Sequence, residues 1–151
     1  MRFMIIVKAS KESEAGVMPQ EKLIAAMATY HEELAKAGAL LDASGLQPTS
    51  KGWRIQYSGG KRTVLDGPFA ETKELIAGYT LIQAKSREDA LEWTKRFPNP
   101  QGEGAACEIE VRQLFELEDF GPSEAADRFR ELGVEKSSRR ATHSLHLLIY
   151  Q

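Results

Sequence analysis

The chain has 151 residues, of which 42% are hydrophobic, so it is long enough for one domain with a sizeable core. Its formal net charge of −2 argues against a nucleic-acid partner, because phosphate contacts need clustered lysine and arginine. No apolar run approaches the roughly 20 residues of a membrane-spanning helix, and Met1 leads directly into a strand pattern without a secretory signal. The single cysteine, Cys107, cannot form an internal disulfide and cannot alone hold a structural zinc, so we expect a cytoplasmic protein. The sequence has no P-loop, Rossmann glycine pattern, HExxH motif or Cys–His cluster, so we also expect neither a metal nor a cofactor.

The first third of the chain changes from a strand pattern to a helix pattern and back. Residues 3–8 form an apolar, β-branched run that is typical of a central strand, and the polar residues 9–19 predict a mobile loop. Apolar residues at i, i+4, i+7 and i+11 predict a helix over residues 20–37, which a glycine ends. A second strand is expected to begin at residues 39–41 and to be broken by residues 45–48.

Residues 52–65 predict a β-hairpin, because apolar and polar residues alternate on both sides of the two-residue turn signal Gly59-Gly60. The hairpin runs directly into residues 66–74, with the sequence DGPFAETKE, where turn residues, charges and an aromatic ring lie within nine positions. Residues 75–84 then predict another strand, in which Gly78 marks a bulge or a close approach of two backbones.

The second half of the chain repeats the helix and strand pattern. A helix begins at the N-cap Ser86 and ends before Pro98, and its apolar stripe includes Phe97. A half-buried strand follows, with Cys107 interpreted as a small core residue at its start and Phe115 near its buried end. Residues 117–136 predict a short amphipathic helix, which would pack across a dimer.

These elements follow the order of a split βαβ arrangement, with an antiparallel sheet and both helices on one face. No element in the sequence covers the other face, which would leave an exposed apolar patch of several hundred Å², so we expect dimerisation through that face. The expected organisation is a domain over residues 1–118, a C-terminal helix over 119–136 and a tail over 137–151. The tail is either an extra strand or sequence read through from an expression vector, and both interpretations stay open.

The DGPFAETKE sequence, followed by Ala77-Gly78-Tyr79, resembles the signature of the DGPF family, part of the YCII-related group of small bacterial proteins. Similar positions occur in the first strand and the first helix, at Gly45-Leu46-Gln47-Pro48, and at Trp93 ahead of Phe97-Pro98, so the resemblance covers about residues 1–118. It implies an α+β, ferredoxin-like fold that dimerises face to face into a dimeric α+β barrel. The biochemical activity of that family is largely undefined, so the resemblance implies a fold more firmly than a reaction.

Asp66 and Glu71 are the predicted catalytic residues. They lie five positions apart across a Gly-Pro turn, so their carboxylates could converge at one pocket. A partly buried pair would have separated pKa values, one group acting as acid and the other as base. The alternative is structural: Asp66 caps the turn, and Glu71 pairs with Lys73 or Arg62.

His31 is a candidate general base on the first predicted helix, although a helix-surface role is the alternative. The resemblance to the wider YCII-related group implies a His–Asp pair with its histidine on this helix. Met27 stands at the corresponding position, and the acidic partner near Phe97-Pro98 is missing, so this pair is not carried over.

The expected function is a homodimer that binds a small organic molecule between sheet and helix, with cofactor-independent enzymatic activity and no nucleic-acid or membrane partner. The alternative is a non-catalytic regulatory or stress-response module, since proteins similar to the DGPF family are often associated with alternative sigma factors. Asp42 and Ser44 are weaker candidates for the same cavity. The predicted substrate-binding residues are Tyr30, His31, Phe69, Thr72 and Tyr79.

Overall fold

In the computed structural model, which describes residues 1–133, strand β1 (Arg2–Lys8) pairs with antiparallel neighbours on both sides. These neighbours are β5 (Ile76–Gln83) and β6 (Ile109–Gln113). Strand β2 (Leu40–Gly45) pairs with the outer edge of β5, which gives the sheet order β2-β5-β1-β6. This all-antiparallel order confirms the predicted α+β, ferredoxin-like split βαβ topology.

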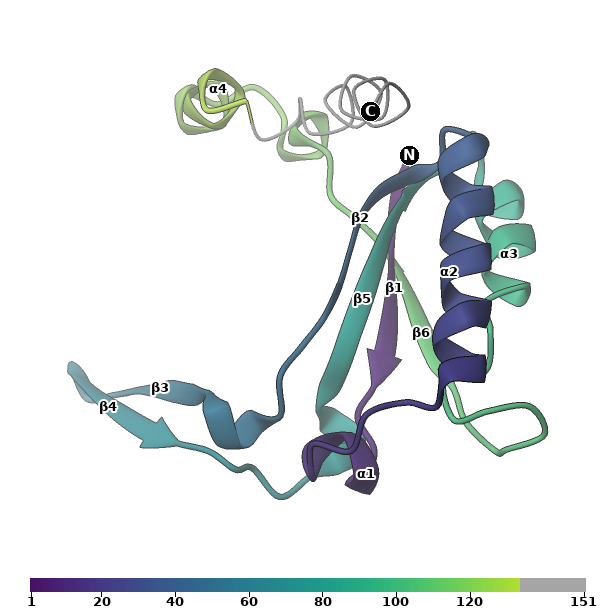
Figure 1. Cartoon of the computed structure of the whole chain (residues 1–151). Helices are drawn as coiled ribbons and strands as arrows, with labels where there is room; N and C mark the ends of the chain where they lie inside the picture. Colours follow the sequence, from purple (N-terminus) through teal and green to yellow (C-terminus); the bar gives the residue numbers. More distant parts are fainter. Residues whose placement is uncertain (134–151) are drawn as a thin grey trace, which may run out of the picture.

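Two helices cover one face of this sheet, α2 (Glu21–Lys36) and α3 (Arg87–Lys95) (Figure 1). The Ser86 hydroxyl accepts a hydrogen bond of 3.0 Å from the Asp89 N–H, which satisfies one free donor in the first turn of α3. Helix α2 ends where Gly38 takes a φ of 70°, a conformation that costs glycine little. Both helices and their end signals therefore agree with the prediction.

The core lies between the helices and the sheet. Ile5 of β1, Leu34 of α2 and Ile82 of β5 are fully buried there, and Phe3 and Tyr30 are nearly so. Burying an aliphatic side chain of this size stabilises a fold by about 1.5–3 kcal/mol. The buried residues of β1 alternate with half-buried ones, so the second face of the strand points away from the core.

Gly78 lies where two strands come unusually close. A Cβ at this position would be 2.9 Å from the Ser44 carbonyl oxygen, closer than real side chains come. The register between β1 and β5 also shifts beside it, between Val7 and Lys8. Both parts of the Gly78 prediction, a bulge and a close backbone approach, are confirmed.

The predicted hairpin is formed by β3 (Trp53–Ser58) and β4 (Lys61–Asp66), which make a separate two-stranded sheet. Gly59 and Gly60 form the turn with φ values of 56° and 78°, as a two-residue turn with positive φ at both central positions requires. The hairpin extends away from the four-stranded sheet (Figure 1).

Three predictions about local structure were wrong or incomplete. The segment 9–19 contains a short helix, α1 (Lys11–Glu14), because Ser10 and Ser13 form a reciprocal capping box. Cys107 is exposed, since β6 starts only at Ile109 and leaves it in the preceding loop. Phe115 lies beyond the end of β6 and is also exposed.

The C-terminal part of the described chain consists of a 3-10 turn, η3 (Leu117–Phe120), and helix α4 (Glu124–Glu131). Residues 134–136 of the predicted helix and the whole predicted tail, 137–151, lie outside the described residues. No helix in residues 1–133 has the length and apolar content needed to cross a membrane.

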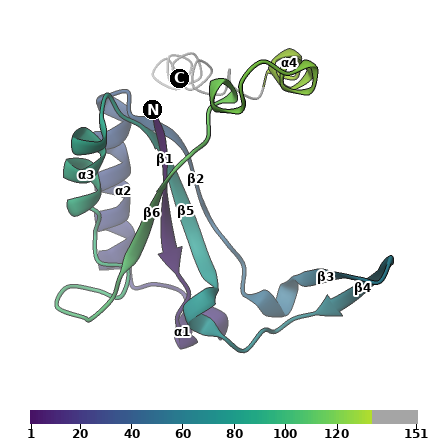
Figure 2. The same cartoon turned by 180° about the vertical axis from the view of Figure 1, so that it is seen from behind.

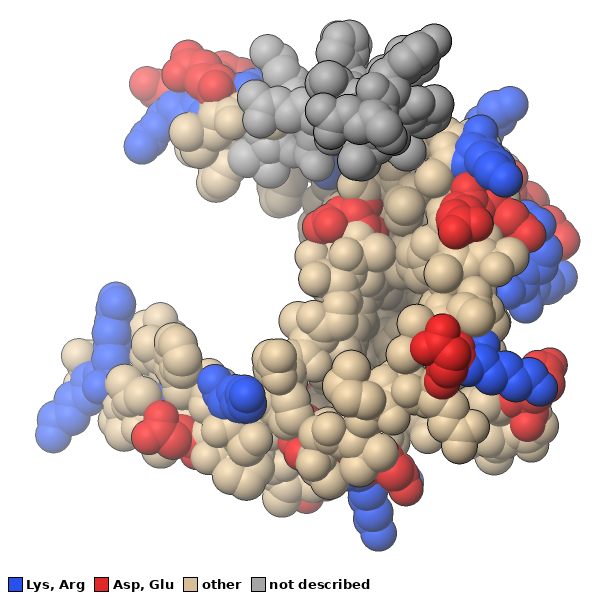
Figure 3. All heavy atoms as spheres, viewed as in Figure 1, with Lys and Arg blue, Asp and Glu red and all other residues tan. Residues whose placement is uncertain are grey.

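The hairpin and the η3–α4 segment project from the same side of the sheet, opposite to α2 and α3 (Figures 1 and 2). The two segments project from opposite ends of the strands, so the described chain is C-shaped. Figure 3 shows a hollow between them with a wall of mostly uncharged residues. The sheet face without helices lies at the base of this hollow.

Candidate functional site

The face of the four-stranded sheet that lies opposite α2 and α3 is called the open face below. Side chains alternate between the two faces of a strand, so the neighbours of the buried Phe3, Ile5, Thr80 and Ile82 belong to it. Cross-strand pairing places Met4 beside Leu81 and Ile6 beside Tyr79. The open face consists of Arg2, Met4, Ile6, Lys8, Asp42, Ser44, Tyr79, Leu81, Gln83, Glu110 and Arg112.

A hydrogen-bonded pair, Tyr79 and Asp42, lies next to the apolar centre of the open face. The Tyr79 hydroxyl donates to Asp42 Oδ2 at 2.9 Å, and the Ala43 N–H donates to Asp42 Oδ1 at 2.8 Å. The hydrogen bond to the Asp42 carboxylate, together with its charge, raises the pKa of Tyr79 above its ordinary value. The pair therefore presents a protonated phenol and a carboxylate whose oxygens can each accept another hydrogen bond.

Charged side chains surround the apolar centre on the side of β6. The Lys8 ammonium and the Arg112 guanidinium each donate to the Glu110 carboxylate at 3.3 Å. These hydrogen bonds, first that of Lys8 and then that of Arg112, lower the pKa of Glu110. The Arg2 guanidinium binds Glu116 at 3.0 Å and connects the sheet to the segment before η3.

The DGPF stretch closes the base of the hairpin against a 3-10 turn, η1 (Thr49–Lys51). A Cβ on Gly67 would be 1.8 Å from the Thr49 carbonyl oxygen, so no other residue fits there without moving the backbone. The Gly67 N–H also donates to the Gly52 carbonyl at 3.0 Å. The glycine of the motif is thus required by a close approach, and its peptide bond to Pro68 is cis.

Thr49 connects the DGPF stretch to α1. Its hydroxyl donates to Glu14 Oε2 at 2.5 Å and accepts from the Phe69 N–H at 3.0 Å, while its own N–H donates to Glu14 Oε1 at 3.2 Å. The Arg54 guanidinium lies 3.8 Å from the centre of the Phe69 ring, within cation–π range. Three segments that are distant in sequence therefore meet at one threonine.

Asp66 and Glu71 lie on the solvent side of this junction. Asp66 is the last residue of β4, Glu71 precedes the 3-10 turn η2 (Thr72–Glu74), and both are exposed. Within residues 1–133, neither carboxylate has a hydrogen bond or an ion pair, including the predicted alternative partners Lys73 and Arg62. Their predicted role as a pair stays a prediction, and any burial has to come from outside the described chain.

Tyr30 and His31 lie on the helix side of the sheet, so the sheet separates them from Tyr79. The buried Tyr30 hydroxyl donates to the Trp93 carbonyl at 2.8 Å, and burial raises the pKa of Tyr30 to about 12. His31 Nδ1 lies 2.7 Å from the Met27 carbonyl and Nε2 lies 2.7 Å from Thr80 Oγ1. Since a carbonyl only accepts, Nδ1 carries a proton and donates to Met27, and Nε2 is hydrogen-bonded to the Thr80 hydroxyl.

The five predicted binding residues thus occupy three places. Tyr30 and His31 join α2 to the core, Tyr79 lies on the open face, and Phe69 and Thr72 belong to the DGPF junction. Sequence reasoning missed Glu14 and Thr49, although the Ser10-x-x-Ser13 spacing could have indicated α1. Among residues 1–133, no group of three or more His, Cys, Asp or Glu side chains is arranged to hold a metal ion.

Gly67→Ala should destabilise the protein by about 1–3 kcal/mol, because its methyl group would overlap the Thr49 carbonyl and displace the hairpin base. Gly52→Ala is the matched control, since its Cβ would lie at an ordinary 3.7 Å from the same oxygen. Urea unfolding of both variants measures the difference. Equal unfolding free energies would show that the DGPF junction adapts to a side chain and that our explanation of Gly67 is wrong.

The Tyr79 hydroxyl should titrate at a higher pH than a free phenol, because the neutral form is held by Asp42. Its stabilising contribution is present below the unfolded pKa and is lost as the pH rises through the raised folded pKa. Tyrosine ¹³Cζ NMR shifts measure this titration, and Asp42→Asn should return it toward the ordinary value. Tyr30 should be unchanged in that variant, since its raised pKa comes from burial.

Comparison with known proteins places this architecture in a family. The YCII-related domain matches residues 1–115. The chain is 30% identical over 106 residues to Uncharacterized protein R00369 of Rhizobium meliloti (strain 1021), an alignment that covers 70% of this chain and 81% of that protein.

Among solved structures, the chain is similar to 5-chloro-2-hydroxyhydroquinone dehydrochlorinase (TftG) from Burkholderia phenoliruptrix AC1100, in complex with 2,5-dihydroxybenzoquinone. The TM-score is 0.39 at 16% identity, with 77% of this chain and 95% of that chain covered. The family match spans most of the chain, including β1, the DGPF stretch and β6. The chain therefore belongs to the YCII-related domain family.

Proposed function

We propose that this protein is a homodimer that binds a small organic molecule over the open face of the sheet, where the open faces of two copies would together enclose the ligand as a dimeric α+β barrel. The observation that carries the proposal is the half-buried apolar centre of the open face, formed by Met4, Ile6 and Leu81. No element in residues 1–133 covers this centre. A soluble chain seldom leaves such a patch in water, so a second copy and a ligand are its natural cover.

The Tyr79–Asp42 pair gives the proposed site its polar end. An apolar body would lie against Met4, Ile6 and Leu81, and a ligand hydroxyl would donate to the free positions of the Asp42 carboxylate. The ligand class that fits is a small hydroxylated organic molecule. The unpaired thiol of Cys107, which is exposed, fits the reducing conditions of the cytoplasm.

Asp66 and Glu71 are the acid/base groups of this proposal if the ligand is also converted. Their support is that both carboxylates are exposed and without a partner among residues 1–133, so they are available to a ligand or a second copy. The alternative, a non-catalytic regulatory module, would keep the dimer and need neither carboxylate. Conversion of a bound ligand distinguishes the two.

Leu81→Lys should turn the dimer into a monomer, because it places a charge at the apolar centre of the open face. An unpaired buried charge costs about 3 kcal/mol or more, which corresponds to a dimer Kd raised more than about a hundredfold. Leu91→Lys is the matched control, since Leu91 is an exposed residue of α3. Sedimentation velocity compares the three proteins, and a wild-type chain that is monomeric throughout would refute the proposed dimer.

Phenol, catechol and hydroquinone serve as ligand probes, with cyclohexane carboxylate as an anionic comparison. A bound probe at about 100 times its Kd stabilises the folded state by about 2.7 kcal/mol, which thermal unfolding detects. Asp42→Asn and Tyr79→Phe should abolish this stabilisation and leave the dimer intact. If both variants bind the probes as the wild type does, the ligand site lies elsewhere.

Asp66→Asn tests the acid/base role in the same assay. It should remain a folded dimer that binds the probe but no longer converts it, which absorbance spectra over time would follow. If Asp66→Asn instead unfolds the chain, then Asp66 is a structural residue of the turn.

A further inference from the structure

The segment after β6 has an apolar side that the rest of the described chain does not cover. Phe115 and Leu132 are each 74% exposed, and Phe120 and Phe129 are also exposed. We call residues 115–132 the C-terminal arm. Ala126 is the one buried residue of α4, and a helix of eight residues is not stable in water by itself. Residues 1–133 therefore leave one apolar side of the arm without cover.

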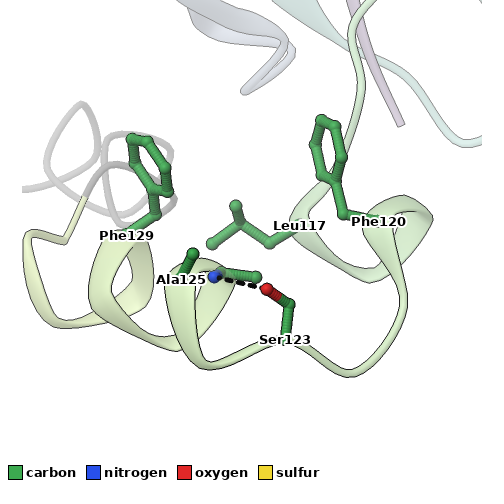
Figure 4. Close-up of a pocket in the computed structure, with 6 residues that line it drawn as sticks. Leu117, Phe120, Ser123, Ala125 and Phe129 are labelled. Atoms are coloured by element: carbon green, nitrogen blue, oxygen red, sulfur yellow. Dashed lines mark hydrogen bonds between the residues drawn. The ribbon is translucent and has the colours of Figure 1, made fainter.

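The apolar side chains of the arm line a small pocket, separate from the hollow over the open face. Figure 4 shows Leu117, Phe120 and Phe129 pointing to the same side of the arm, while the Ser123 hydroxyl caps α4 by accepting from the Ala126 N–H at 3.3 Å. This pocket has a volume of about 320 Å³, which is enough for one or two large side chains. Its lining is almost entirely apolar, so it fits hydrocarbon or aromatic groups better than a charged ligand.

The β3–β4 hairpin has a matching apolar face. Antiparallel pairing of Ile55 with Val64 puts both on one face, and strand alternation adds Trp53 and Tyr57 to it, with Arg62 opposite Tyr57 and Asp66 opposite Trp53 at its two ends. Trp53 is 64% exposed and Tyr57 is 67% exposed. An isolated two-stranded hairpin is only marginally stable, so this surface needs a partner.

The two surfaces carry opposite charge. Residues 116–131 of the arm contain six acidic residues and two arginines, whereas residues 53–66 of the hairpin contain three basic residues and one aspartate. Within residues 1–133, Glu124 and Glu131 of the arm have no ion pair, and neither do Lys61 and Arg62 of the hairpin. Each surface therefore has charges available for the other.

One chain cannot bring these two surfaces together, because they lie at opposite ends of its sheet (Figures 1 and 2). Both project from the side of the open face. When a second copy faces the first with its strands reversed about a twofold axis, the arm of each copy reaches the hairpin of the other. The contact is then made twice.

We propose that each C-terminal arm docks onto the β3–β4 hairpin of a second copy of the chain, with the acidic residues of the arm against the basic tip of the hairpin. This inference rests on the proposed homodimer and adds a reciprocal exchange of arms to it. The exchange closes both ends of the hollow over the open face, so the enclosure of the ligand site depends on the partner's arm and hairpin.

Charge reversal in the full chain tests the exchange. The hairpin variant Lys61→Glu/Arg62→Glu and the arm variant Glu124→Lys/Glu131→Lys should each raise the dimer Kd by at least about tenfold at low salt, since the first makes the contact repulsive and the second removes its attraction. The chain with all four substitutions should recover part of the wild-type affinity, because the introduced lysines of the arm then face the introduced glutamates of the hairpin. Glu88→Lys/Glu92→Lys on α3 is the control and should leave the Kd unchanged.

The outcomes separate the possible arrangements. If hairpins pair with hairpins and arms with arms, reversal leaves like charges facing each other, so no double variant weakens the dimer and the exchange is refuted. If the arm variant alone weakens the dimer, the arm docks elsewhere than on the hairpin. A dimer indifferent to all reversals keeps the proposed homodimer and refutes the exchange, whereas a monomeric wild type refutes both.

Trp53 supplies an independent measurement. In a Trp93→Phe chain it is the only tryptophan, and its emission should move to shorter wavelength as the concentration rises through the dimer Kd, since the partner's arm buries the indole. Phe129→Ala should reduce that shift. An unchanged emission maximum in a protein that still dimerises would place the hairpin outside the interface.

Discussion

The central constraint on this molecule is that its sheet has helices on one face only. Strand β1 is bonded on both edges, and its side chains alternate between the helix-covered core, with Phe3 and Ile5, and the open face, with Met4 and Ile6. On the open face this strand has charged residues only at its two ends, Arg2 and Lys8, so its centre is apolar and uncovered. The uncovered apolar centre and the candidate site beside it follow from this arrangement, since both depend on where apolar residues lie on the sheet.

The DGPF stretch has a structural role, because it joins the base of the hairpin to η1 and α1. Gly67 lets the backbone pass against the Thr49 carbonyl, and Thr49 in turn binds Glu14 and the Phe69 N–H, so the base of the hairpin, η1 and α1 are held together. The hairpin itself has little else to fix its direction. A substitution that shifts the backbone at the junction should therefore also shift the exposed aromatic residues of the hairpin.

The sequence predicts the sheet, both main helices and the hairpin, because each has a strong period and an end signal such as Gly38, Ser86 or Gly59-Gly60. It could not place the candidate site residues relative to one another. Tyr30 and Tyr79 both read as aromatic residues in amphipathic elements, yet the sheet separates them, since strand parity and not composition decides which face a side chain takes. The prediction for Cys107 was wrong for a related reason. The alternating pattern extends two residues before the start of β6 at Ile109, but β1 no longer pairs with the chain there, so Cys107 lies in a loop.

This separation determines what chemistry each side of the sheet can offer. A general base must exchange a proton with its substrate, and both nitrogens of His31 are already engaged, one with the Met27 carbonyl and one with the Thr80 hydroxyl. The helix side is therefore built to hold α2 against β5. On the open face, Asp42 uses one position on each carboxylate oxygen and keeps the others free, beside a phenol that stays protonated at neutral pH. We therefore assign the proposed ligand site to the open face, which lies in the hollow between the arm and the hairpin, so in the proposed dimer the elements that would shield the ligand are the same ones that would contact the second copy.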